Sequence, residues 1–282
     1  MRLGLSTPVV VQVPGVAAPW EADAGIDDLA MIATAADRLG FDYLTCSEHV
    51  AIPSADAATR GAVYWDPLAT LGYLAAHTQR IRLATSVLVL GYHHPLEIAK
   101  RYGTLDVVTG GRLVLGVGIG SLTEEFALIG AAWEHRAARA DDAIRALRAS
   151  LSTSTPQYHG QFYDYQGVTV LPHTQQRRVP IWVGGRSMGS LRRAVELADG
   201  WMPFGLTYDA VRDMLTKVQL SEGFEVLLPT SVDPESDPKR TRSLLSKLRD
   251  AGATAITCTV RSASARHYCD QLARLRDLED ST

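Results

Sequence analysis

A strand-forming segment followed by a helix-forming segment recurs eight times along this chain of 282 residues. The strand candidates are short apolar runs, and the helix candidates carry apolar residues three or four positions apart. The expected strands are residues 2–13, 41–47, 81–90, 113–120, 180–183, 200–204, 224–228 and 254–260. The expected helices are residues 26–39, 68–78, 95–108, 137–151, 191–198, 208–220, 239–250 and 263–278. Asp66-Pro67 and His94-Pro95 have the chemistry of helix starts before two of these helices.

Eight such units of about 35 residues predict an α/β fold of the TIM (β/α)8 barrel type, which needs roughly 250 residues. We expect one barrel domain over residues 1–282, and a doubly wound parallel sheet is the alternative. Polar and glycine residues gather at or just beyond the expected strand ends, where a barrel builds its active site. These residues are Glu48, His49, Ser86, Gly118 to Ser121, Gly184 to Ser187, Asp233 and Arg261.

The pattern is interrupted after the fourth helix. Residues 152–179 are polar and contain Gly160, Gly167 and Pro172 between short alternating patches. Such a segment predicts a hairpin-like insertion rather than another strand and helix of the barrel.

The fourth expected strand loses its side chains on one face. Gly116, Gly118 and Gly120 alternate there with branched apolar residues. In an extended strand this leaves one apolar face and one face of bare backbone toward the strand end. We therefore expect a bulky ligand to lie against Gly118 and Gly120.

The turn after this strand is expected to begin a helix. Ser121 and Glu124 have the spacing of a capping box, in which the serine side chain caps the helix and the glutamate reaches back. The dinucleotide fingerprint G-x-G-x-x-G is not met, because Ser121 or Thr123 stands where its third glycine belongs.

The overall composition excludes several classes of protein. Hydrophobic residues make up 46% of the chain, charged residues make up 21%, and the formal net charge is -3. Scattered Lys and Arg residues give no basic surface for nucleic acid. No apolar run reaches the roughly 18 to 20 residues of a membrane span, and the first residues do not form a signal peptide, so we expect a cytoplasmic protein. The cysteines Cys46, Cys258 and Cys269 form no disulfide framework, and we expect Cys46 and Cys258 in the core.

Two groups of residues at strand ends have the chemistry of a site. Gly184-Gly185-Arg186-Ser187 precedes a helix and could cradle a phosphate with backbone N–H groups, although a plain loop with a capping serine is the alternative. His49 follows a buried strand, and it is either a structural histidine or an imidazole facing a ligand. Glu48 is expected to have a structural partner. The other histidines have no metal-site spacing, and no nucleophile elbow is present, so we expect no metal.

A set of ordered motifs between residues 44 and 201 resembles the luciferase-like flavin and deazaflavin oxidoreductases, and within them the branch that uses the deazaflavin coenzyme F420. The motifs are Ser47-Glu48-His49, Ala84 to Leu88, His94-Pro95-Leu96 with Ala99-Lys100, Thr104-Leu105-Asp106 with Gly110-Gly111-Arg112, Leu115 to Gly118, Glu125-Phe126, Pro180 to Ser187, and Ala198 to Trp201. After Phe204 the chain resembles the family only in the alternation of strand and helix segments that is typical of the barrel.

The resemblance implies roles for individual residues. The Ser86-Val87 bond matches a non-prolyl cis peptide behind the deazaflavin ring. His49 matches a histidine beside the ring, and Gly184 and Gly185 match a phosphate turn that Arg186 and Ser187 complete. Residues 152–179 fall where the family varies a substrate lid. Members that act on sugar phosphates carry a carboxylate at the position of Ser121, so the resemblance does not extend to that substrate.

The resulting hypothesis is an F420-dependent oxidoreductase that transfers a hydride between the deazaflavin C5 and an unidentified small organic substrate. The ring would lie on Ser86 and Val87, and the strand end at Gly118 and Gly120 would leave room for its side chain. One alternative is a monooxygenase that uses FMN, and a further alternative is a noncatalytic flavin-binding protein. The resemblance also implies a homodimer.

Overall fold

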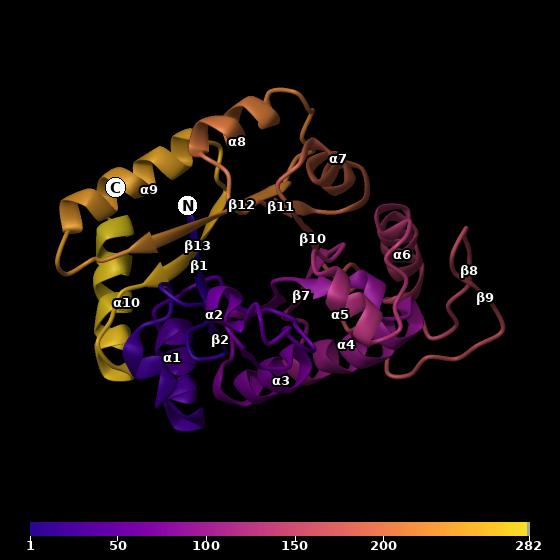
Figure 1. The fold of residues 1–282 in the computed structure, drawn as a ribbon, viewed down its shortest axis with the longest axis horizontal. Helices are drawn as coiled ribbons and strands as arrows, with labels where there is room; N and C mark the ends of the chain where they lie inside the picture. The colour runs from indigo at the N-terminus through magenta and orange to yellow at the C-terminus, as the bar shows by residue number, and fades with distance from the viewer. Residues whose placement is uncertain (281–282) are drawn as a thin grey trace.

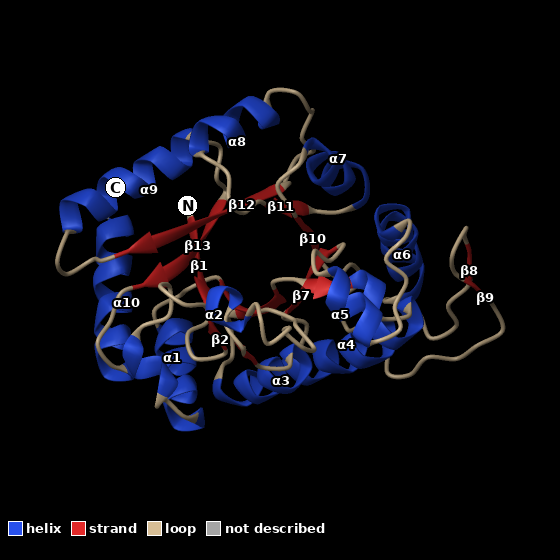
Figure 2. Cartoon of the chain, viewed as in Figure 1, coloured by secondary structure: helices blue, strands red, loops and turns tan. Residues whose placement is uncertain are grey.

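The computed structural model describes residues 1–280, and eight parallel strands close into a barrel within them (Figure 2). Each strand pairs with its neighbours around the ring, and the β7–β10 pair completes the closure. The barrel strands are β1 (Arg2–Ser6), β3 (Tyr43–Cys46), β5 (Arg82–Thr85), β7 (Leu113–Gly118), β10 (Ile181–Gly184), β11 (Gly200–Met202), β12 (Glu225–Val232) and β13 (Ala255–Val260). The predicted TIM barrel is confirmed.

One long helix follows each barrel strand and covers the outside of the ring (Figure 1). These helices are α1 (Ile26–Arg38), α3 (Pro67–His77), α4 (Pro95–Thr109), α6 (Arg136–Ser150), α7 (Met188–Leu197), α8 (Tyr208–Leu215), α9 (Pro238–Asp250) and α10 (Ala265–Asp280). Two predicted helix starts are confirmed: the Asp66 side chain accepts from Ala69 N, and His94 Nδ1 accepts from Leu96 N. None of the helices within residues 1–280 is long and apolar enough to cross a membrane.

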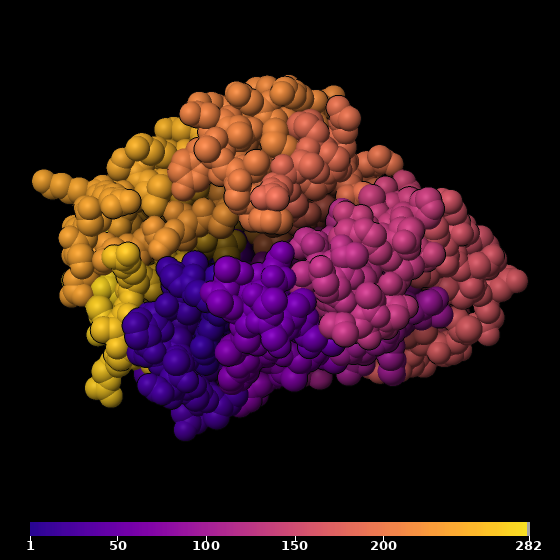
Figure 3. Space-filling model, viewed as in Figure 1, coloured from indigo at the N-terminus to yellow at the C-terminus, as the bar shows by residue number. Residues whose placement is uncertain are grey.

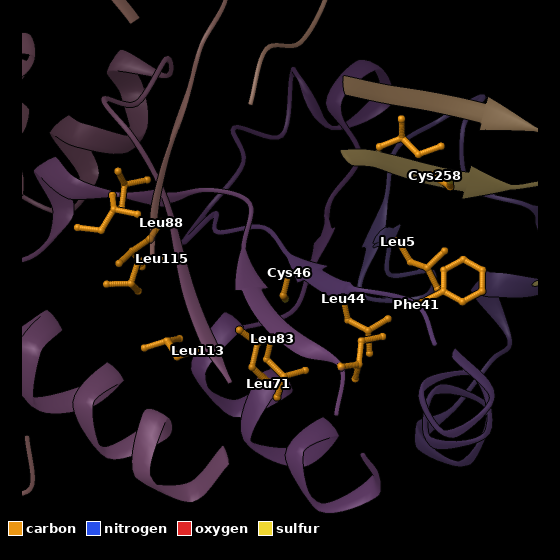
Figure 4. Packing of buried hydrophobic residues seen from close by; sticks show 14 of the residues in the cluster. Leu5, Phe41, Leu44, Cys46, Leu71, Leu83, Leu88, Leu113, Leu115 and Cys258 are labelled. Atoms are coloured by element: carbon orange, nitrogen blue, oxygen red, sulfur yellow. The ribbon is translucent and has the colours of Figure 1, made fainter. Parts of the chain in front are cut away.

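The barrel has an inner and an outer hydrophobic layer. Inside, Tyr43 and Trp182 meet edge to face at 5.0 Å between ring centroids and fill the barrel with small and aliphatic neighbours. The outer layer lies between strands and helices, and Figure 4 shows Leu44, Leu83 and Leu113 within it. Because side chains alternate along a strand, consecutive residues such as Tyr43 and Leu44 supply the two layers.

The expected buried thiols lie in this core. Cys46 and Cys258 are both buried, and burial raises the pKa of each thiol to about 12. Thiols that are so hard to ionise are poor nucleophiles, which fits a packing role.

Two expected strands differ from the sequence pattern. The run 2–13 is a barrel strand only to Ser6, and its end forms β2 (Val11–Gln12), which pairs with β4 (Val63–Tyr64) outside the barrel. The run 81–90 breaks after Thr85 and resumes as β6 (Leu88–Val89), followed by the single turn η2 (Leu90–Tyr92). Apolar composition is the same before and after each break, so it does not mark where pairing stops.

The remaining short elements lie in the loops. They are η1 (Pro19–Ala22), α2 (Ala57–Arg60) and α5 (Thr123–Leu128), which precedes the long helix α6 of the fourth unit. Gly130, at a φ of +70°, lies between α5 and α6 in a backbone conformation that breaks a helix.

Within the segment 152–179, β8 (Tyr158–His159) and β9 (Asp164–Tyr165) form an antiparallel hairpin. Asp142 on α6 holds it, accepting from the Tyr158 hydroxyl and from Phe162 N at 2.7 Å. Figure 2 draws this hairpin beyond α6, at the rim of the molecule. A role as a substrate lid stays a prediction.

Candidate active site

The loop after β3 is tied to the segment after β5 at the carboxyl ends of the strands. Ser47 Oγ donates to the Ser86 carbonyl at 2.6 Å, and the buried Glu48 carboxylate accepts from Val89 N at 2.7 Å. The Ser86–Val87 peptide bond is cis, as the resemblance implies. The two segments named by separate motifs therefore form one connected surface.

Val87 packs against glycines of two further strands. A Cβ atom added at Gly118 would come within 2.6 Å of the Val87 side chain, and one at Gly184 would come within 2.7 Å. At Gly120 an added Cβ would meet the Phe126 ring at 2.4 Å. The expectation of a bare strand face at Gly118 and Gly120 is therefore wrong, because the protein's own side chains occupy the space the glycines leave. Val87 itself remains partly exposed.

His49 is paired with a buried carboxylate from the other side of the site. Its Nδ1 atom lies 2.8 Å from Oε2 of Glu125, a residue of α5 with a fully buried side chain. The same carboxylate accepts from the Tyr92 hydroxyl at 2.7 Å and from the backbone N–H groups of Val50 and Ala51. Because a carboxylate only accepts, we assign the proton of the imidazole to Nδ1, which leaves Nε2 for a ligand.

The charge of Glu125 is set by opposing effects. Burial raises the pKa of the carboxyl. The hydrogen bonds from Tyr92, His49 and the backbone lower the pKa by more than burial raises it, so the net pKa lies below its ordinary value. The His49 side chain is 21% exposed and packs edge to face on Tyr64 at 4.5 Å between ring centroids. The arrangement is a partly accessible imidazole held by a permanent anion.

A second histidine and glutamate pair lies beneath the Ser86–Val87 segment. His93 Nε2 is 2.7 Å from Glu48 Oε1, which confirms that Glu48 has a structural partner. Burial lowers the pKa of His93, but the hydrogen bond and the charge of Glu48 outweigh it, so the pKa is raised. Because Glu48 also accepts from Val89 N, this pair fixes the base of the segment.

The glycine turn after β10 has the form of an anion cradle. Gly185 has a φ of +139°, and an added Cβ would come within 2.7 Å of the Ser190 Cβ, so only glycine fits without strain. Ser187 caps α7, since its Oγ accepts from Ser190 N at 3.2 Å. The capping serine of the alternative interpretation is therefore present.

Donors for an anion nevertheless remain at this turn. Arg186 is exposed, and no acceptor for its guanidinium is found in residues 1–280. The N–H groups of Met188 and Gly189 begin α7, where no preceding turn can accept from them. Together these groups could hold a phosphate at the helix start.

Ser121 does not cap a helix, contrary to expectation. The helix α5 begins at Thr123 with Leu122 at the cap position, and no side chain caps it. Ser121 is exposed instead. Phe126, in the helix that follows, packs against Gly120.

The structure brings His49, Ser86, Val87, Gly118 and Gly184 together at one side of the barrel mouth. Figure 3 shows the surface hollowed where the purple part of the chain meets the orange part. The sequence did not predict that Glu125 would pair with His49, and its only sequence signal was its place in a family motif. No sequence signal pointed to the contact of Tyr92 with Glu125. Within the described part of the chain, no cluster of three or more His, Cys, Asp or Glu is placed to hold a metal ion.

Comparisons with known proteins agree with this geometry. Residues 1–256 match the family model described as luciferase-like monooxygenase. A relative from Microbacterium testaceum, named F420-dependent glucose-6-phosphate dehydrogenase, is 31% identical over 183 residues, which are 63% of this chain and 52% of the relative.

Two solved structures share the fold over nearly the whole chain. The monooxygenase RslO1 from Streptomyces bottropensis has a TM-score of 0.78 at 20% identity and covers 100% of both chains. An F420-dependent secondary alcohol dehydrogenase, solved with an F420–acetone adduct, has a TM-score of 0.76 at 14% identity and covers 98% of both chains.

Proposed function

The chain belongs to the luciferase-like monooxygenase family, and we propose that it is an F420-dependent oxidoreductase that transfers a hydride between the deazaflavin C5 and a small organic substrate. The motifs of the F420 branch and the F420-dependent relative support the choice of cofactor. The substrate of that relative is not carried over, because Ser121 stands where a carboxylate is expected in members acting on sugar phosphates.

One observation carries the proposal: the segments 47–49, 86–89 and 184–187 meet at neighbouring strand ends. Ser47 donates to the Ser86 carbonyl, and Val87 lies against Gly184. An imidazole, a partly exposed apolar side chain and an anion cradle are thereby placed side by side. The apolar side chain and the cradle suit a planar ring with a phosphate-bearing side chain, and the imidazole would serve the proton transfer.

The residues present fit such a cofactor. Ser86 and Val87 would support the ring, and Gly118 contributes by giving Val87 its place. The turn Gly184 to Ser187 would hold the phosphate through backbone N–H groups and the Arg186 guanidinium. Gly120 contributes indirectly as well, because its lack of a side chain leaves room for the Phe126 ring.

When bound, F420 supplies or accepts a hydride at C5, and the protein must provide the accompanying proton. With Nδ1 held by Glu125, His49 has Nε2 free to donate that proton to, or accept it from, a substrate oxygen. Glu125 stabilises the imidazolium form during the transfer and keeps the ring in one orientation. Glu48 and His93 act as the structural base of this arrangement.

A monooxygenase that uses FMN is the second candidate, favoured by the description of the matching family and by the fold shared with RslO1. The turn at Gly184 would accept the phosphate of either cofactor. The two candidates differ in chemistry, because only the monooxygenase consumes oxygen.

The deciding experiment is a pair of titrations of the purified chain with F420 and with FMN, followed by fluorescence. We expect F420 to bind at least tenfold more tightly, and oxygen uptake with reduced FMN to stay at background. Tighter FMN binding together with oxygen uptake would assign the chain to the monooxygenases. Binding of neither cofactor would contradict both candidates.

A further inference from the structure

Two cavities at the opposite side of the barrel mouth take no part in the proposed cofactor site. The first has a volume of about 430 Å³ and lies among the end of β12, the start of α9 and the residue after β13. The second has a volume of about 520 Å³ and lies between the same strand ends and the loop near Val16. Both are lined by Ser231, Asp233 and Arg261, so these residues separate two adjoining hollows.

The second cavity adjoins the barrel interior. Thr257 points inward, since its hydroxyl meets that of Tyr43 at 2.7 Å inside the barrel. Thr259 lies two positions further on β13 and therefore has the same orientation, and Ser231 pairs with it in register. A molecule in this cavity would thus reach the mouth from β12 and β13, across from Val87.

Two arginines that line the first cavity have no partner for their guanidinium groups in the described part of the chain. Arg240 and Arg261 are both exposed, and neither guanidinium has an acceptor among residues 1–280. Arg261 has a fixed base, because its backbone N–H donates to the Val232 carbonyl at 3.0 Å. Its side chain is therefore an available donor at a defined place between the hollows.

The acidic residues of the first cavity are engaged locally. Asp233 Oδ1 accepts from Ser236 N at 3.1 Å, and Asp237 Oδ1 accepts from Arg240 N at 2.9 Å. These bonds shape the turn into α9. Neither carboxylate pairs with the Arg240 or Arg261 guanidinium among residues 1–280, so both arginines keep their donors. Loops after the seventh and eighth strands are also where TIM barrels frequently bind phosphate groups.

We propose that Arg261, assisted by Arg240, forms a subsite for an anionic group, a phosphate or a carboxylate, on the substrate. A guanidinium can bind either group through two parallel hydrogen bonds. The assignment of the ligand as a substrate rests on the proposed function. The presence of an anion site at Arg261 does not depend on that function. The inference restricts the unidentified substrate to small organic anions.

The test uses the full chain without cofactor and two probes, inorganic phosphate and succinate. Binding is followed through the side-chain Nε–H resonance of Arg261, so that phosphate at the Gly184 turn is not mistaken for it. We expect saturable shifts with at least one probe, and the stronger probe indicates whether the group is a phosphate or a carboxylate. Absence of a saturable shift with both probes would overturn the inference.

Variants separate this subsite from general surface charge. We expect Arg261→Ala to weaken binding of the stronger probe at least about tenfold, measured by calorimetry, as is typical for loss of a charged hydrogen bond. Arg242→Ala is the matched control, since it removes an exposed arginine of α9 that does not line either cavity. Equal effects of the two variants would overturn the inference.

The same variants distinguish the two proposals. Arg261→Ala should leave F420 affinity unchanged, because Arg261 lies across the mouth from Val87. A loss of F420 affinity in this variant would show that the site serves the cofactor and would overturn the substrate assignment. If the chain binds a probe at Arg261 but binds no F420, the anion site stands and the proposed function fails.

Discussion

Nδ1 of His49 lies 2.8 Å from Oε2 of Glu125, although the two residues are 76 positions apart in the chain. The contact joins the loop after the second barrel strand to the helix after the fourth. It gives the imidazole one orientation and one tautomer, and it places a buried negative charge behind it. The first two predictions follow from this pair.

Glu125→Gln should weaken catalysis by disturbing His49 rather than by removing a group that touches substrate. An amide offers one acceptor oxygen where the carboxylate serves four donors, so His49 should lose its preference for the Nδ1–H tautomer. We expect kcat to fall about tenfold or more with a smaller change in KM, and the free energy of unfolding to fall by about 2 kcal/mol. Long-range ¹⁵N NMR of His49 reports the tautomer without any cofactor.

Glu124→Gln is the matched control for this change. Glu124 lies beside Glu125 on the same helix, but its side chain is exposed. It should leave the tautomer and the stability unchanged. An unaltered His49 spectrum in Glu125→Gln would refute the positioning role.

His49→Ala should separate cofactor binding from proton transfer. The cradle at Gly184 does not involve His49, so F420 affinity should change little, while kcat should fall by roughly 10² to 10⁴. His77→Ala is the control, because this histidine ends α3 at the other end of the barrel. Unchanged kcat in His49→Ala would leave the histidine as a structural residue only.

Gly185→Ala should destabilise the phosphate turn. The φ of +139° and the 2.7 Å approach to Ser190 both exclude a Cβ atom, and strain of this kind costs about 1 to 3 kcal/mol. Chemical denaturation measures the loss, and weaker F420 binding should accompany it. Gly189→Ala, nearby in α7, should be neutral or slightly stabilising, since its added Cβ meets Ser187 Oγ only at 3.6 Å. Equal stability of the two variants would contradict the turn's need for glycine.

His93→Gln should change how stability depends on pH. Burial lowers the pKa of His93 in the folded chain, and Arg101 lowers it weakly, but the hydrogen bond and charge of Glu48 and the charge of Glu97 outweigh them, so the pKa is raised. The stabilisation from its protonation is therefore complete below the unfolded pKa of about 6.5 and is lost as pH rises through the folded value. The stability difference between the wild type and the variant should shrink from pH 5.5 to 8.5, as measured by urea denaturation. A difference that does not vary with pH would refute this account.

Much of the fold was available from local sequence signals. The alternation of apolar runs and helical faces predicts the eight units, because each unit buries one strand and one helix face. Helix starts at Asp66 and His94 depend on neighbours within three residues, and both are confirmed. The end of the first strand at Ser6 and the break after Thr85 were not predictable, since each depends on which strand pairs alongside.

The candidate site divides in the same way. Local sequence identifies the glycine turn at Gly185 and the capping Ser187, because both depend on the backbone geometry of residues only a few positions away. By contrast, the capping role expected of Ser121 fails, since α5 begins at Thr123 with Leu122 at its cap position. The face expected to be bare at Gly118 is filled by Val87, which lies between β5 and β6.

The sequence by itself determined the barrel and placed the candidate site residues at its strand ends, since periodicity and turn chemistry act over short distances. Only the tertiary structure decided that Glu125 holds His49, that Val87 lies between Gly118 and Gly184, and that Arg261 faces two cavities. These relationships join residues from different units of the barrel. Closure of the ring brings them together, and no local pattern records which side chain will lie opposite another.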